Sequence, residues 1–224
     1  MENKKKVIIL GGAGIGTIAA WIVKRRQDAE VVGFLNDVLP VGSQIGQKKK
    51  YDVIGTSDDL ERYLKEDYYF IMAFHGMQRE EMVFNKVMAM NIPEEKLYSA
   101  IDPQAIVDPE FSDIAPGVII APGAQIGPDC IIEKYCVCLG NSFVGHDTHV
   151  KSFSHIATNA VVGAFVEVGR ACHIGSNATI REKTIIGDFS LIGSGSVVLK
   201  HVEEKSIMVG NPARLLRKSD MVEK

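Results

Sequence analysis

An aliphatic residue recurs at every sixth position through the second half of the chain. The series spans 84 residues without an insertion, and fourteen of its fifteen positions are Ile or Val: Ile114, Ile120, Ile126, Ile132, Cys138, Val144, Val150, Ile156, Val162, Val168, Ile174, Ile180, Ile186, Ile192 and Val198. Ile and Val make up 47 of the 224 residues, so chance would place about three of them in such a series. A fixed short period indicates one small unit repeated and stacked along an axis.

The other positions of the repeat describe that unit. Four residues after each aliphatic residue the side chain is small, as at Ala124, Ser142 and Ala160. Side chains alternate along a strand, so these two positions share the inner face. One residue after the aliphatic, Gly or Ala recurs, where a side chain would collide or where φ must be positive. Each hexapeptide is therefore predicted to be a short strand and a corner of a β-solenoid.

The first hundred residues show a different pattern, in which apolar runs alternate with helical segments. We expect strands at 7–10, 31–35, 53–54 and 68–74 and helices at 17–26, 56–65 and 78–91. Such alternation predicts an α/β domain with a parallel sheet and helices on its faces. Pro103 and Pro109 interrupt the pattern, which places two domains at 1–105 and 106–224.

A glycine-rich loop joins the first predicted strand and helix. Residues 11–16 read Gly-Gly-Ala-Gly-Ile-Gly, and free amides at such a helix start can bind phosphate. Thr17 occupies the third glycine position of the dinucleotide fingerprint, so the loop is also consistent with a plain tight turn. Asn36 and Asp37 end the second strand, where they can contact a ribose or base or form a solvated turn.

Both halves together resemble the sialic acid O-acetyltransferase family, which includes N-acetyltransferases of nucleotide-linked amino sugars. The resemblance implies a Rossmann-like N-terminal domain that binds the sugar or nucleotide-sugar, followed by a left-handed parallel β-helix. It also implies acetyl-CoA as co-substrate, bound between the subunits of a homotrimer. The family's glycine loop usually carries a histidine where this chain has Ile15, and its paired aspartates correspond to Asn36 and Asp37. The substrate-binding positions carried over are Ala13, Gly14, Ile15, Asn36 and Asp37.

The same resemblance implies the catalytic residues. The family's histidine, its acidic neighbour and a second histidine nine positions on correspond to His146, Asp147 and His155. The resemblance makes His146 the general base and Asp147 the residue that raises its basicity, while His155 contacts acetyl-CoA. A histidine suits the removal of a proton from an attacking amine or hydroxyl at neutral pH.

Further coenzyme A contacts are expected at corners and at the C-terminus. Ser176 and Ser194 follow glycines at repeat corners and are the acetyl-CoA candidates by family position. The family's Gly-Asn-Pro-Ala-Arg ending is present at 210–214. Arg214, Arg217 and Lys218 are candidates for the CoA phosphates, with a solvated C-terminal helix as the alternative.

Other functions stay open at this point. A different acyl donor or a small-molecule acceptor fits the same fold. A non-catalytic trimeric, sugar-binding scaffold is a second alternative, favoured by the missing loop histidine. His155 and His173 are 18 residues apart and would stack, which invites comparison with zinc-dependent carbonic anhydrases of related fold, but the ligand spacing of that class is missing. We therefore predict no metal.

Composition excludes several classes of partner. The formal net charge is −3, which predicts neither nucleic acid nor membrane binding. The apolar segment at 7–23 is broken by glycines and followed by basic residues, so we expect neither a signal peptide nor a membrane anchor. The four cysteines, three of them at the small inward position, are expected to fill the core of a reduced cytoplasmic protein.

Overall fold

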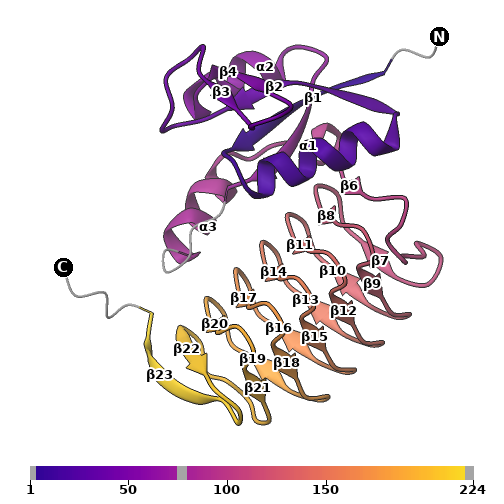
Figure 1. The fold of residues 1–224 in the computed structure, drawn as a ribbon, viewed down its shortest axis with the longest axis vertical. Coiled ribbons are helices and arrows are strands. Elements are labelled where there is room, and N and C mark those ends of the chain that lie inside the picture. Colours follow the sequence, from indigo (N-terminus) through magenta and orange to yellow (C-terminus); the bar gives the residue numbers. More distant parts are fainter. Residues whose placement is uncertain (1–3, 75–79, 220–224) are drawn as a thin grey trace.

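The computed structural model describes residues 4–74 and 80–219. An N-terminal α/β domain sits on one end of a solenoid, whose coils stack away from it (Figure 1). Helix α1 (Ile15–Arg26) lies between the N-terminal sheet and the solenoid, and α3 (Glu80–Ala89) runs down beside the solenoid's flank.

The N-terminal sheet has the strand order β3-β4-β2-β1-β5. Its strands are β1 (Lys5–Gly11), β2 (Ala29–Leu35), β3 (Gln44–Ile45), β4 (Tyr51–Gly55) and β5 (Tyr69–Ala73). All pairings are parallel except the hairpin formed by β3 and β4. The strands β1, β2 and β5 are largely buried on both faces, as parallel sheets are when helices cover them.

The sequence predicts this domain with two differences. The segment expected to be a turn contains β3, which is only two residues long and therefore carries no alternation to detect. The helix expected at 56–65 is a 3₁₀ turn (Ser57–Asp59) followed by α2 (Leu60–Leu64), capped by Thr56 and Asp59. Of the helix expected at 78–91, residues 78–79 lie outside the described residues, and α3 accounts for 80–89.

The solenoid consists of three parallel sheets, one for each side of a triangular coil. From β7 to β21 consecutive strands belong to different sheets, and strands 18 residues apart pair within one sheet. The strands are β6 (Ala100–Ile101), β7 (Asp113–Ile114), β8 (Ile119–Ile120), β9 (Gln125–Ile126), β10 (Ile131–Ile132), β11 (Val137–Cys138), β12 (Phe143–Val144), β13 (His149–Val150), β14 (His155–Ile156), β15 (Val161–Val162), β16 (Glu167–Val168), β17 (His173–Ile174), β18 (Thr179–Ile180), β19 (Ile185–Ile186), β20 (Leu191–Ile192), β21 (Val197–Val198), β22 (Ser206–Val209) and β23 (Arg214–Lys218).

The predicted inner face of the repeat is confirmed. From Ile120 onward every aliphatic position is buried, and the smaller side chains four residues later are buried too. Burial of a branched side chain contributes about 1.5–3 kcal/mol, so this continuous apolar column is what holds the coils together. Ile114, in the first coil of the regular series, is only partly buried and packs against the edge of the column.

The sequence offered two reasons for the glycines at the corners, steric collision of a side chain and positive φ, and the structure distinguishes them. Glycines directly after the aliphatic residue are required by close approach: a Cβ on Gly145 would lie 2.7 Å from Ala164 N. Positive φ occurs two residues later instead, where mostly non-glycine residues adopt it, for example Asp147 (φ 55°) and Phe165 (φ 57°). The second half of the expectation, positive φ at the glycine position, is therefore wrong.

The two domains share a continuous interface. Strand β6 pairs with β8, so the chain enters a solenoid sheet at Ala100, before the expected boundary at residue 105. The apolar face of α1 packs in one cluster with Ile119 and Val137 of the solenoid. From α3, Phe84 contacts the rings of Phe153 and Phe189, at centroid distances of 6.3 and 5.7 Å.

The C-terminus is a strand rather than the solvated helix considered from the sequence. Strand β23 pairs antiparallel with β22 and so closes the end of the solenoid sheet. Among the described residues, no helix has the length and apolar character needed to cross a membrane.

Candidate active site

The predicted catalytic pair lies at a corner of the solenoid between β12 and β13. His146 Nδ1 is 2.7 Å from Asp147 Oδ2, and both side chains are about half exposed. A carboxylate at Nδ1 favours the tautomer that carries its proton there, which leaves Nε2 as the acceptor. The corner therefore presents an oriented imidazole at the surface.

The local backbone explains why adjacent side chains meet. Neighbouring side chains diverge on a strand, but Asp147 is in the left-handed region, which turns its carboxylate toward His146. The His146 ring also packs edge-to-face on Phe165 in the next coil, with centroids 5.1 Å apart. The contacts with Asp147 and Phe165 together fix the orientation of the His146 ring.

His155 lies on a different side of the coil from His146. His155 opens β14, and the whole of β13 separates it from the His146 corner. It is 6% exposed, and its ring packs edge-to-face on that of His173, with centroids 4.8 Å apart. The two histidines interrupt an otherwise apolar ladder formed by Ile119, Val137, Leu191 and Ile207. The structure therefore stacks His155 on His173, as the spacing predicts, and does not place His155 beside His146 within one chain.

The coenzyme A candidates occupy two places on the solenoid. Ser176 and Ser194 follow β17 and β20 at the same corner of adjacent coils, where Gly195 N donates to Ser176 O at 2.8 Å. Arg214 lines a cavity of about 500 Å³ between the last coil and β23, together with Lys200 and His201. Lys218 pairs with Glu203 at 3.0 Å, so its charge is already compensated.

The glycine loop has an open tip. Ala13 and Gly14 are exposed, and Gly14 has a φ of 83°, which begins α1 without a side-chain cap. Ile15 is half-buried and packs against the core cluster beneath α1. Gly16, which the fingerprint does not include, sets the closest approach of α1 to the sheet, because a Cβ there would lie 2.7 Å from the Phe34 ring.

Asn36 and Asp37 make different contacts from each other. The Asn36 side chain is buried, donates to Gly11 O at 2.8 Å and accepts from the amides of Val38 and Leu39. It therefore fixes the loops at the sheet edge. Asp37 accepts from Ser57 N at 2.7 Å and pairs with Lys86 Nζ at 2.6 Å.

The Asp37 carboxylate is held in its charged form. Partial burial raises its pKa, but the hydrogen bonds from Lys86 and Ser57 outweigh this and hold the pKa below its ordinary range. Sequence reasoning missed Lys86, because nothing in the repeat or the glycine loop connects α3 to the end of β2. Whether Asn36 and Asp37 contact a substrate stays a prediction.

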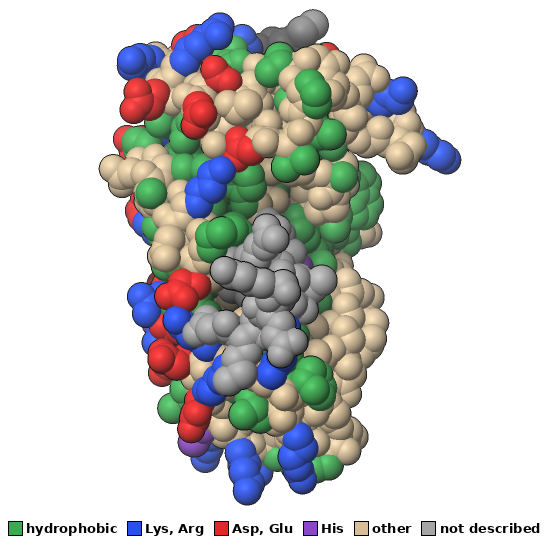
Figure 2. Space-filling view, turned by 90° about the vertical axis from the view of Figure 1, so that its left-hand side faces the viewer, with side chains coloured by type: hydrophobic (Ala, Val, Ile, Leu, Met, Phe, Trp, Pro, Cys, Tyr) green, Lys and Arg blue, Asp and Glu red, His purple; other side chains and the backbone are tan. Residues whose placement is uncertain are grey.

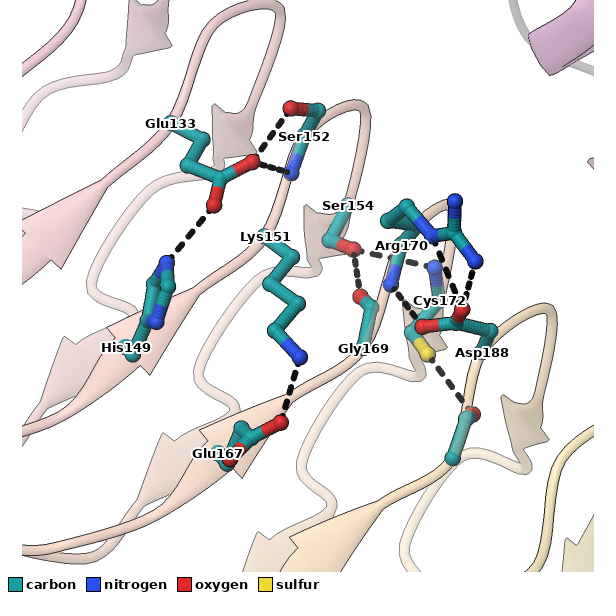
Figure 3. Close-up of polar contacts among 11 residues, drawn as sticks. Glu133, His149, Lys151, Ser152, Ser154, Glu167, Gly169, Arg170, Cys172 and Asp188 are labelled. Atoms are coloured by element: carbon teal, nitrogen blue, oxygen red, sulfur yellow. Dashed lines mark hydrogen bonds and ion pairs between the residues drawn. The ribbon is translucent and has the colours of Figure 1, made fainter.

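One side of the solenoid carries ion pairs that join neighbouring coils (Figure 3). Glu133 Oε1 lies 2.7 Å from His149 Nε2, Lys151 pairs with Glu167, and Arg170 pairs with Asp188. Burial raises the pKa of Glu133, yet hydrogen bonds from Ser152 and His149 lower it overall. This side is internally compensated in charge.

The outward face formed by β12 and β15 is different in character. Phe143 and Val161 are paired across these strands and are each 39% exposed. Phe165, at the His146 corner, and Ile131 and Ile185, on the adjoining side, add 43–50% exposed apolar surface. His146 therefore stands at the edge of an apolar strip, defined as Phe143, Val161 and Phe165.

One cysteine reaches the His146 corner from inside the solenoid, because Cys130 Sγ donates to Gly145 O at 3.1 Å. All four cysteines are buried thiols, as expected for core residues. Within residues 4–74 and 80–219, no group of three or more His, Cys, Asp or Glu residues is arranged to hold a metal ion.

Two protein families match separate parts of the chain. The family described as the PglD N-terminal domain matches residues 6–87, and the family described as bacterial transferase hexapeptide (six repeats) matches residues 165–200. No curated protein sequence matches the chain significantly. The chain therefore combines a PglD-type N-terminal domain with hexapeptide repeats, which confirms the family resemblance at the level of its domains.

Solved structures share the whole architecture. A mutant of perosamine N-acetyltransferase from Caulobacter crescentus, in complex with CoA and GDP-perosamine, is 18% identical with a TM-score of 0.82, covering 97% of this chain and 99% of that one. The acetyltransferase domain of PglB from Neisseria gonorrhoeae, in complex with acetyl coenzyme A, is 23% identical with a TM-score of 0.81, covering 96% and 100%. WeeI from Acinetobacter baumannii is 20% identical with a TM-score of 0.76, covering 95% and 100%. The expected fold, a Rossmann-like domain followed by a left-handed parallel β-helix, is confirmed.

Proposed function

We propose that this chain, a PglD-type domain joined to a hexapeptide β-helix, is an acetyl-CoA-dependent sugar acetyltransferase. Its acceptor is the nitrogen or oxygen of a nucleotide-linked amino sugar or a sialic-acid-like sugar. The observation that carries the proposal is the oriented pair of His146 and Asp147, 2.7 Å apart at a solenoid corner. The solved structures of the same architecture that bind CoA or acetyl-CoA support the choice of co-substrate.

The chemistry assigned to His146 follows from its free Nε2. As the acceptor nitrogen or oxygen attacks the thioester carbonyl, its proton passes to Nε2, and a C–N or C–O bond forms. When the tetrahedral intermediate collapses, the C–S bond breaks and the CoA sulfur receives the proton held at Nε2, which regenerates the neutral imidazole. Asp147 stabilises the imidazolium formed in between, because its carboxylate is already in contact with Nδ1. Acetyl-CoA and the acceptor sugar are thereby converted to CoA and the acetylated sugar, and the step uses no metal.

The separation of His146 from His155 supports a homotrimer. The two residues lie on different sides of one coil, so a single acetyl group meets both only if a neighbouring subunit brings its own solenoid alongside. The apolar strip of Phe143, Val161 and Phe165 beside His146 is a surface that such a contact would bury. In this arrangement His155 contacts the acetyl-CoA bound against the partner's His146 corner, and Ser176 and Ser194 line the coenzyme's path. A cytoplasmic location remains part of the proposal.

The test is release of the free CoA thiol from acetyl-CoA against UDP-, GDP- and dTDP-linked amino sugars and free sialic acids. We expect one acceptor class to give turnover, and His146→Ala to lower kcat by about 10²–10⁴-fold, the usual contribution of a general base. His149→Ala is the matched control, because His149 is bound to Glu133 on another side of the coil. Turnover by His146→Ala at the wild-type rate would exclude the mechanism. Silence across the panel without binding of acetyl-CoA would favour a non-catalytic scaffold.

A further inference from the structure

Two imidazole rings are stacked on the outward side of one solenoid sheet. His155 of β14 and His173 of β17 are direct partners in the parallel register. Backbone hydrogen bonds fix this register, because His155 N donates to Cys172 O at 2.8 Å and His173 N donates to Ser190 O at 2.9 Å. Neighbouring strands of a sheet lie about 4.8 Å apart, and the two ring centroids are also 4.8 Å apart. The backbone therefore sets the distance between the rings.

The two rings meet edge to face and are not parallel. The angle between their planes is 88°, so the edge of one ring points at the face of the other. Aromatic pairs prefer this arrangement, because the positive edge of one ring meets the negative face of the other. An aliphatic side chain at position 173 would fill the space but would provide neither an edge nor a face. The contact between the rings therefore resists rotation of the His155 imidazole.

The positions on either side of the pair are apolar. Val137 pairs with His155 from the preceding coil, and Leu191 pairs with His173 from the following coil. His155 is buried and His173 is half-buried. In Figure 2, hydrophobic side chains gather where the N-terminal domain meets the solenoid, and very little histidine surface shows on this face. Burial of a polar ring costs free energy that an aliphatic side chain does not, so stability alone does not explain a histidine at position 173.

A histidine that contacts a ligand must present one particular edge of its ring. Rotation of the imidazole by 180° about the Cβ–Cγ bond exchanges a ring nitrogen for a ring carbon at the point of contact, and only the nitrogen forms a hydrogen bond. His173 contacts the His155 ring from the following coil, whereas Val137 on the preceding coil has no ring. His173 is therefore placed to select one orientation of His155.

We propose that His173 is a positioning residue for acetyl transfer, which holds the His155 imidazole in the orientation that contacts acetyl-CoA. The inference rests on the proposed function in one respect, that His155 is the coenzyme contact. His173 acts through the ring contact with His155, so it need not touch the coenzyme. No proton moves at His173, and the chemistry assigned to His146 is unchanged.

A double-mutant cycle separates positioning from a direct role of His173. His173→Leu introduces the side chain that Leu191 already carries on the next strand, and we expect it to raise the Kd and KM for acetyl-CoA about 2–12-fold, the loss of one edge-to-face pair. The KM for the acceptor should not change. In the His155→Ala background the same replacement should have no further effect, because the ring that His173 orients is missing. Equal losses in both backgrounds would overturn the inference.

Two more variants provide a rescue and a matched control. His173→Phe keeps a ring edge and a ring face at the same position, so it should restore the Kd to near the wild-type value. Leu191→Val shortens a side chain of the same ladder that pairs with His173 and not with His155, so it should leave the Kd unchanged. A Kd for His173→Phe equal to that of His173→Leu would contradict positioning by a ring. Tm is measured for each variant, so that partial unfolding is recognised as such.

The orientation of the ring is also measurable without the coenzyme. Nitrogen-15 NMR of the imidazoles should show one set of His155 signals in the wild type and in His173→Phe, and doubled or averaged signals in His173→Leu. One unchanged set of signals in His173→Leu would overturn the inference.

The outcomes separate this inference from the proposed function. Acetyl transfer by the wild type, together with equal losses in both backgrounds of the cycle, would overturn the positioning role and leave the acetyltransferase proposal standing. A His155 ring ordered by His173, in a protein that neither binds acetyl-CoA nor transfers acetyl groups, would overturn the proposed function and the coenzyme contact assigned to His155.

Discussion

The replacement Gly127→Ala perturbs the candidate catalytic corner through the backbone of the coil beneath it. A Cβ on Gly127 would lie 2.8 Å from His146 N and 3.2 Å from His146 Cα, whereas ordinary contact begins at 3.4 Å. The corner must therefore open by about 0.6 Å. Gly127 N also donates to Val144 O at 2.8 Å, and an opening of that size takes this bond beyond the usual range for N–H donors.

The magnitude follows from these contacts. Overpacking of this kind costs about 1–3 kcal/mol, of which a weakened hydrogen bond accounts for about 0.5–1.5 kcal/mol. For a chain of this length 1 kcal/mol lowers Tm by about 2–4 °C, so we expect a decrease of about 2–12 °C. Because the same Cβ pushes on His146 itself, kcat should also fall about tenfold, given that a 1 Å misplacement can cost about 100-fold.

Two other glycines supply matched controls. A Cβ on Gly169 would lie 2.6 Å from Asp188 N, a comparable overlap at a different corner of the solenoid, so Gly169→Ala should lower Tm similarly and leave kcat nearly unchanged. A Cβ on Gly140 would reach its nearest atom, Pro122 O, only at 3.4 Å, so Gly140→Ala should change neither quantity. Thermal unfolding and thiol release are measured for all three. If Gly127→Ala matched Gly140→Ala in Tm, the steric reasoning would be refuted. If Gly127→Ala matched Gly169→Ala in kcat, the link to His146 would be refuted.

Two further predictions concern titrating groups. Complete burial raises the pKa of the Cys138 thiol to about 12, so we expect Cys138, like the other three buried cysteines, to resist a thiol reagent at pH 8 until the protein is unfolded; fast labelling of the native protein would contradict this. Burial raises the pKa of Asp28, but hydrogen bonds from Arg26 and Tyr98 lower it overall, below the ordinary value of 3.8. The charged carboxylate therefore stabilises the fold above that pH. This stabilisation is lost as the pH falls through the lower pKa of the folded state. Asp28→Asn should therefore reduce the free energy of unfolding by up to about 1 kcal/mol at pH 7, because the pair is partly exposed, and the difference from wild type should vanish at low pH in denaturant titrations; a difference that persisted at low pH would contradict the assignment.

The solenoid was predictable because its information is local and repeated. Each hexapeptide has a branched side chain followed four residues later by a smaller one. A strand of two residues cannot be recognised from one such unit, but fifteen repetitions make the pattern unmistakable. The N-terminal domain was predictable in its strand and helix order but not in its details. Strand β3 is a two-residue strand without a repeat, and Gly16 acts through a ring of another strand, so neither leaves a pattern in its own segment.

In the candidate site, too, the residues were predictable from the sequence and their contacts were not. His146, Asp147 and His155 were predicted from a motif. The contact of His146 with Asp147 depends on the left-handed backbone conformation of Asp147, which the sequence does not predict. Lys86 at Asp37 and Lys49 near Trp21 come from segments distant in sequence. Their placement depends on how α3 and the hairpin pack.

By itself, the sequence determined the period, the inner face of the solenoid, the division into two kinds of fold and the residues worth testing. These follow from side-chain alternation and from sterics between neighbours along the chain. Only the tertiary structure decided which residues from different elements meet: His146 with Phe165, α1 with the end of the solenoid, and Lys49 with Trp21 around one cavity. The physical reason is that such contacts are set by the packing of whole elements, whose spacing depends on every side chain between them and not on any single segment.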